Sequence, residues 1–97
     1  MASVPFVMRR MLKTCRSEER LPSDEEFKAN KPAYKAALKA ARDLAGEEPL
    51  DDIGEWAVEW TKETGELPTP ERFRKQTRQF LTQRGIEIPE DSVLATP

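Results

Sequence analysis

Two groups of basic side chains recur at helical spacing and have the chemistry to bind anions. Lysine and arginine contact phosphate oxygens, and arginine and glutamine also contact base edges. Glutamines accompany the second group. The pattern therefore predicts nucleic-acid binding by eight residues on two helices: Lys31, Lys35, Lys39, Arg42, Arg72, Arg74, Lys75 and Arg78.

Residues for catalysis or metal binding are scarce. The chain has no histidine, which is the commonest general base and metal ligand. It also has no glycine-rich phosphate loop and no nucleophile motif. The acidic string that runs from Glu47 to Glu59 lacks the spaced ligands and the glycine of a calcium loop, and we interpret it as a solvated helix face. We therefore predict a non-enzymatic protein without a metal or cofactor.

The single cysteine, Cys15, falls on the apolar stripe of the expected first helix, where a buried structural thiol is the expected role. One cysteine cannot form an internal disulfide, so the composition favours a reducing compartment, and we expect a cytoplasmic protein. No apolar run approaches the length of a membrane span, so we expect no membrane partner.

The net charge of −2 hides a strong segregation along the 97 residues. Residues 1–46 carry ten Lys/Arg and six Asp/Glu, residues 47–66 carry one and eight, and residues 67–97 carry five and four. This asymmetry fits a nucleic-acid-binding or regulatory protein, and it equally fits an adaptor that meets a protein partner of complementary charge. Basic residues gathered on one surface, with the acidic helix turned away, would favour nucleic acid. An exposed apolar groove would favour a protein ligand.

A short motif that occurs twice organises the helices. Residues 67–74 read Leu-Pro-Thr-Pro-Glu-Arg-Phe-Arg, and residues 21–28 read Leu-Pro-Ser-Asp-Glu-Glu-Phe-Lys. Ser23 with Glu26 forms a capping-box pattern, and Thr69 followed by Pro70 is typical of a helix start. The repeating unit is then a helix, a Leu-Pro turn and a second helix. Duplication and shared capping chemistry both explain it.

The first unit covers about residues 3–46. We expect a helix over 3–17 that Ser3 caps; its basic, amphipathic character also fits an organelle-targeting peptide. A second helix begins near residue 24. Because proline removes a hydrogen bond inside a helix, we expect it either to kink at Pro32 or, preferably, to end near Asn30 and restart at Pro32, stopping at Gly46.

The second unit covers about residues 51–85. After a linker over 47–51, Asp51 or Asp52 is expected to cap a third helix that ends at Gly65. A fourth helix is expected from Pro70 to Arg84, and the two helices have a helix-turn-helix layout. The tail, 86–97, is expected to lie extended across the helices.

The sequence thus predicts one all-α domain over residues 1–97, with four helices in two helix-turn-helix units. The tryptophans are the largest apolar groups, so we expect them at the centre of the core. The full set of expected core residues is Trp56, Trp60, Phe73, Phe80, Leu38 and Tyr34.

Overall fold

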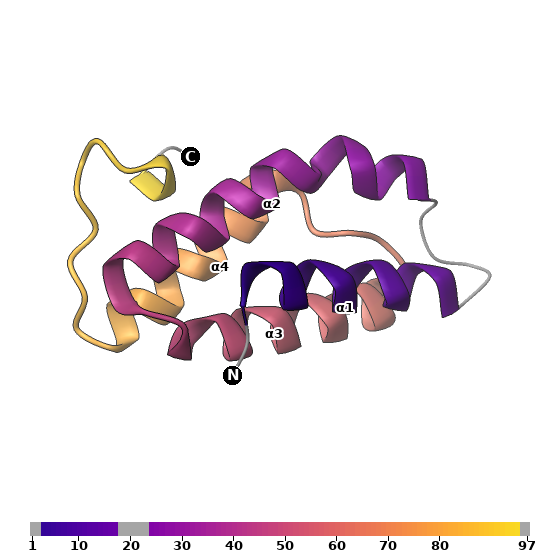
Figure 1. Ribbon diagram of the computed structural model, residues 1–97, viewed down its shortest axis with the longest axis horizontal. Helices are drawn as coiled ribbons and strands as arrows, with labels where there is room; N and C mark the ends of the chain where they lie inside the picture. The colour runs from indigo at the N-terminus through magenta and orange to yellow at the C-terminus, as the bar shows by residue number, and fades with distance from the viewer. Residues whose placement is uncertain (1–2, 18–23, 96–97) are drawn as a thin grey trace.

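The computed structural model describes residues 3–17 and 24–95 and confirms the all-α prediction (Figure 1). The described part contains four α-helices, one short 3₁₀-helix and no strand. None of its helices combines the length and the apolar character needed to cross a membrane. The elements are α1 (Val4–Ser17), α2 (Asp24–Ala45), α3 (Glu48–Thr64), α4 (Pro70–Gln83) and the 3₁₀-helix η1 (Val93–Ala95).

Local chemistry sets most helix ends as the sequence predicts. The Ser3 hydroxyl accepts a hydrogen bond from the Phe6 backbone N–H at 3.3 Å, and the Thr69 hydroxyl accepts one from the Arg72 N–H at 3.1 Å. At the end of α3, Gly65 adopts a φ of 74°, a left-handed conformation that favours glycine. The expected capping box at Ser23 lies outside the described residues.

The predicted break in the second helix is wrong. Residues 24–45 form one helix with Pro32 inside it, and its ribbon bends along its length in Figure 1. Proline deprives the Lys28 carbonyl of its usual N–H donor, but both residues are exposed, so water can reach that carbonyl. The free-energy cost of the missing hydrogen bond is therefore small, and packing of the opposite face of α2 is enough to keep the helix continuous.

The predicted start of the third helix is also wrong. The structure begins α3 at Glu48, and Glu47 precedes it without a side-chain cap, so the expected linker forms the first turn. Pro49 lies in that turn, where its missing N–H has no intrahelical partner to lose. Pro49 and Leu50 are both buried, so tertiary packing replaces the cap that Asp51 or Asp52 was expected to supply.

The four helices pack as two antiparallel hairpins laid side by side (Figure 1). α1 packs along α3 and α2 packs along α4, whereas α1 and α4 make no contact within the described residues. Gly54 allows the close approach of α1 to α3, because an added Cβ would lie 3.2 Å from both γ-carbons of Val7. α1 and α4 thus occupy separate corners of the bundle.

Tyr34, not a tryptophan, lies at the centre of the core. Its ring is fully buried, with ring centroids 4.7 Å from Phe73 and 6.3 Å from Phe27, and its hydroxyl donates to the Pro68 carbonyl. Phe73 and Leu38 are buried as predicted. A tyrosine suits this place because the hydroxyl finds an acceptor in the turn between α3 and α4.

The expected place of the tryptophans was therefore wrong. Trp56 and Trp60 are only partly buried, and their rings pack against each other with centroids 5.7 Å apart. Phe80 is also partly buried. Phe27 and Phe73, the phenylalanines of the two Leu-Pro motifs, both pack on Tyr34, but duplication stays an interpretation because the first Leu-Pro turn lies outside the described residues.

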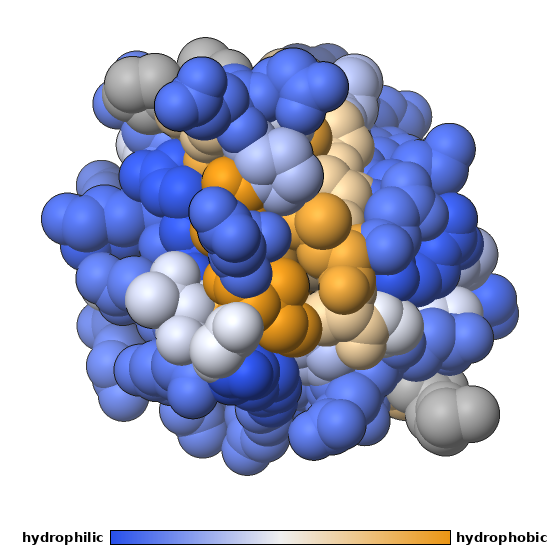
Figure 2. Space-filling view, turned by 90° about the vertical axis from the view of Figure 1, so that its left-hand side faces the viewer, coloured by the Kyte–Doolittle hydropathy of each residue, from blue (hydrophilic) through white to orange (hydrophobic). Residues whose placement is uncertain are grey.

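The tail crosses one end of the bundle. It runs extended to Pro89 and then turns into η1, where Leu94 is fully buried and its carbonyl accepts from Arg78 Nη1 at 2.6 Å. Among the apolar residues of the tail, Ile86 and Ile88 are partly buried and Val93 is exposed. Figure 2 views this end and shows apolar side chains gathered between polar ones. The tail therefore covers the core here without closing it completely.

Candidate nucleic-acid interface

A groove between α1 and α2 combines an apolar floor with a basic rim. Its volume is about 180 Å³. Met8 and Phe27 are buried in its floor, whereas the rim residues Arg9, Lys31 and Lys35 are exposed. The complete lining is Pro5, Met8, Arg9 and Leu12 from α1, with Phe27, Lys31 and Lys35 from α2.

The basic rim continues along α2. Five basic residues recur at three- and four-residue steps, which places them on one side of the helix, and all five are exposed. The first and the last are 14 positions apart, which is about 21 Å of helix at 1.5 Å per residue. They are Lys28, Lys31, Lys35, Lys39 and Arg42.

α1 carries further basic residues. Residues 4–17 contain four basic and no acidic residues. Arg9 and Lys13 are exposed, and Arg10 is half-buried with its guanidinium 5.9 Å from the centre of the Phe6 ring. We call the surface made by these two helices the basic face; its members are Arg9, Arg10, Lys13, Lys28, Lys31, Lys35, Lys39 and Arg42.

The predicted residues of α4 lie elsewhere. Arg72, Lys75 and Arg78 line a separate shallow hollow of about 260 Å³ together with Thr69 and Glu71. Arg74 does not line this hollow and is half-buried. The structure thus gathers the α2 residues with α1 and leaves the α4 residues as a second, smaller cluster.

Two arginines of α4 also hold the fold together. The Arg72 guanidinium lies 5.1 Å from the centre of the Trp60 ring, a cation–π contact between α4 and α3. The Arg78 guanidinium donates to the carbonyl of Leu94 in the tail. Their charges are therefore partly committed to contacts within the protein.

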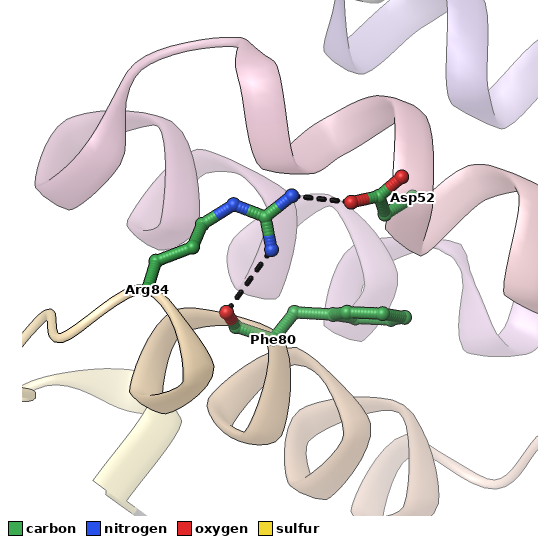
Figure 3. A network of polar contacts seen from close by, with 3 residues as sticks. All are labelled: Asp52, Phe80 and Arg84. Atoms are coloured by element: carbon green, nitrogen blue, oxygen red, sulfur yellow. Dashed lines mark hydrogen bonds and ion pairs between the residues drawn. The ribbon is translucent and has the colours of Figure 1, made fainter.

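α3 and α4 form an antiparallel hairpin (Figure 1). The Arg84 guanidinium at the end of α4 pairs with Asp52 in the first turns of α3 and donates to the Phe80 carbonyl at 3.1 Å (Figure 3). At the other end of the hairpin, Arg72 lies over Trp60. In a DNA-binding helix-turn-helix the two helices cross at about 90–120°, so that the second helix enters the groove. Here two contacts, Arg84 with Asp52 and Arg72 with Trp60, join α4 to α3 in antiparallel order.

This hairpin carries an acidic hollow. Asp52, Glu55 and Glu59 line it with the rings of Trp56 and Phe80, and its volume is about 260 Å³. Because carboxylates repel a phosphate backbone, this side of α4 is unfavourable for nucleic acid. The acidic residues of this hollow thus lie on the α3–α4 half of the bundle, whereas the basic face belongs to α1 and α2.

Sequence reasoning missed the groove itself. It placed Lys31 and Lys35 correctly on one exposed side of a helix, but it did not place Arg9 beside them or identify Phe27 and Leu12 as groove residues. The available signal was the pairing of two consecutive basic helices through a short connection, which predicts antiparallel neighbours.

Comparison with known proteins gives no further guide to the site. No protein-family model matches the chain, and no curated protein and no solved structure matches it either. Among the residues whose side chains the structure describes, no three carboxylates are grouped so that they could hold a metal ion. The site is therefore interpreted from its own geometry.

Proposed function

We propose that the protein binds nucleic acid through the basic face and catalyses no reaction. One observation carries the proposal: antiparallel packing of α1 on α2 places Arg9 beside Lys31 and Lys35 around one groove. α2 then continues the row of cations for about 21 Å. A surface that gathers basic residues from two helices is the electrostatic footprint of a nucleic-acid-binding protein, despite the net charge of −2.

The strength of this binding is expected to depend steeply on salt. Each neutralised phosphate releases condensed counterions, so the logarithm of the affinity falls with the logarithm of salt concentration by about 0.9 per contact on duplex DNA. If about five of the eight cations contact phosphates, raising salt from about 50 to 200 mM would weaken binding by a factor of roughly 500. A weak slope would mean that few of these cations take part.

Two charge-reversal pairs test which surface binds. Both Lys31→Glu with Lys35→Glu and Arg72→Glu with Lys75→Glu change the net charge equally, and the residues of both pairs are exposed. We expect the α2 pair to abolish binding of random-sequence DNA at about 50 mM salt, and the α4 pair to weaken it only through the long-range field. Equal losses would restore the original prediction that α2 and α4 act together. Absence of binding by the unaltered protein would refute the proposal.

The acidic hollow favours a second candidate, a regulatory adaptor that binds a basic protein segment. Carboxylates of Glu55 and Glu59 beside the ring of Trp56 suit a lysine or arginine side chain, through ion pairing and cation–π contact. A lysine- and arginine-rich peptide should then change the tryptophan fluorescence, to which Trp56 contributes, in the unaltered protein but not in the variant with Glu55→Gln and Glu59→Gln. With either function, the single cysteine is the argument for a cytoplasmic location.

A further inference from the structure

We propose that the basic face selects single-stranded nucleic acid, holding one unpaired base in the α1–α2 groove and stacking another on Phe6. This inference rests on the proposed function and narrows its ligand. Part of the groove lining is apolar, and phosphate binding alone does not explain apolar residues at this place. The exposed Pro5 and the partly buried Leu12 line the groove together with Arg9 of α1 and with Lys31 and Lys35 of α2.

The groove floor distinguishes single strands from duplexes. In a duplex the base faces are stacked inside, and a protein meets phosphates, sugars and base edges. A single strand exposes the flat apolar faces of its bases, and proteins that bind it combine a positive track for the backbone with apolar or aromatic surfaces for the bases. Arg9, Lys31 and Lys35 supply the track, and the exposed Pro5 with the partly buried Leu12 supplies the apolar surface.

Phe6 supplies a second stacking surface. Its side chain is 45% exposed, although most large apolar side chains of the described residues are buried in the bundle. The guanidinium of Arg10 lies 5.9 Å from its ring centre. Phe6 adjoins Pro5 and precedes Arg9 by one turn, and both of these line the groove. An exposed ring beside a guanidinium is a platform on which any base can stack.

The size of the groove argues against an amphipathic helix of a protein partner. Such a helix docks through several side chains at positions i, i+3, i+4 and i+7, and small-molecule pockets are typically about 300–1,000 Å³. The α1–α2 groove measures about 180 Å³. It has room for one flat group, and the row of cations along α2 continues beyond it, as a chain of phosphates requires.

The test compares three labelled ligands of equal length by fluorescence anisotropy at about 50 mM salt: oligothymidylate, a duplex, and an abasic single strand that has phosphates but no bases. We expect oligothymidylate to bind at least about tenfold more tightly than the abasic strand, because base stacking contributes in only one of them. Phe6→Ala should weaken the binding of oligothymidylate by about 5- to 150-fold and leave the binding of the abasic strand unchanged. Val93→Ala, which truncates another exposed apolar residue, is the matched control.

The outcomes separate this inference from the function on which it rests. Lys31→Gln should weaken the binding of all three ligands by a similar factor, because it removes a contact to phosphate. Equal binding of the three ligands with no effect of Phe6→Ala would overturn the base-binding inference and leave nucleic-acid binding in place. Failure of all three ligands to bind would overturn both. Displacement of oligothymidylate by a tighter-binding acidic amphipathic peptide would identify the groove as a protein-binding site and overturn the inference.

Discussion

The close approach of α1 to α3 at Gly54 predicts that the effect of one substitution on stability will change sign with the residue at position 7. Gly54 lies in the middle of α3, where glycine lowers helix stability by about 1 kcal/mol relative to alanine. Gly54→Ala should therefore stabilise the helix itself. The new Cβ would, however, lie 3.2 Å from both γ-carbons of Val7, which is closer than ordinary carbon–carbon contact.

The balance of these two effects can be worked out from the structure. Overpacking of a well-packed core costs about 1–3 kcal/mol, so Gly54→Ala should lower the free energy of unfolding by about 0–2 kcal/mol in the unaltered protein. Val7→Ala removes the two γ-carbons and leaves the residue-7 Cβ 3.7 Å from the new one, an ordinary contact. In that background Gly54→Ala should raise the free energy of unfolding by about 1 kcal/mol.

A double-mutant cycle measured by urea unfolding gives the coupling between the two sites. We expect a coupling of about 1–3 kcal/mol, within the range for residues in direct contact. Leu81→Ala on α4 is the control background, because no atom of Leu81 is among those nearest to the added Cβ. If Gly54→Ala changed the free energy of unfolding equally in the Val7→Ala and unaltered backgrounds, the close approach of α1 to α3 would be refuted.

Three further stability measurements test contacts that shape the bundle. Tyr34→Phe removes the donor to the buried Pro68 carbonyl and should lower the free energy of unfolding by about 1–3 kcal/mol, which corresponds to a fall of several degrees in Tm. A decrease of less than about 0.5 kcal/mol would contradict that hydrogen bond. Pro32→Ala restores a backbone N–H inside α2 and should raise Tm, whereas a lower Tm would show that the proline is needed there. Arg84→Ala breaks the partly exposed ion pair with Asp52 and should lower the free energy of unfolding by at most about 1 kcal/mol, and by less at high salt. A larger decrease that does not depend on salt would contradict the interpretation of this contact as a partly exposed ion pair.

The parts of the fold that local chemistry determines could be predicted from the sequence. A hydroxyl three residues before a free backbone N–H identifies a helix start, and this was confirmed at Ser3 and at Thr69. Glycine correctly marked the ends of α2 and α3. Each of these signals involves residues within about one turn of one another, so they act before tertiary packing is known.

The wrong predictions concern features that depend on distant residues. Pro32 breaks an isolated helix, but burial of Tyr34 and Leu38 on the other side of α2 holds this one together. Size alone placed the tryptophans at the core centre. The centre instead holds the residue whose hydroxyl reaches a carbonyl 34 positions along the chain, and the sequence alone gives no such contact. The groove beside Arg9 likewise depends on how two helices meet.

The separation of charge between neighbouring helices makes the molecule an electric dipole. α1 carries four basic and no acidic residues, and α3 carries six acidic and one basic. Near a polyanion this dipole experiences a torque that turns the α1–α2 side toward the polyanion before the two molecules make contact. The molecule measures 39 × 27 × 20 Å, whereas the screening length is about 10 Å at 0.1 M salt and about 30 Å at 0.01 M. Rotational steering therefore extends across the whole molecule only in dilute salt, where the association rate should exceed that of a protein with the same charges evenly distributed.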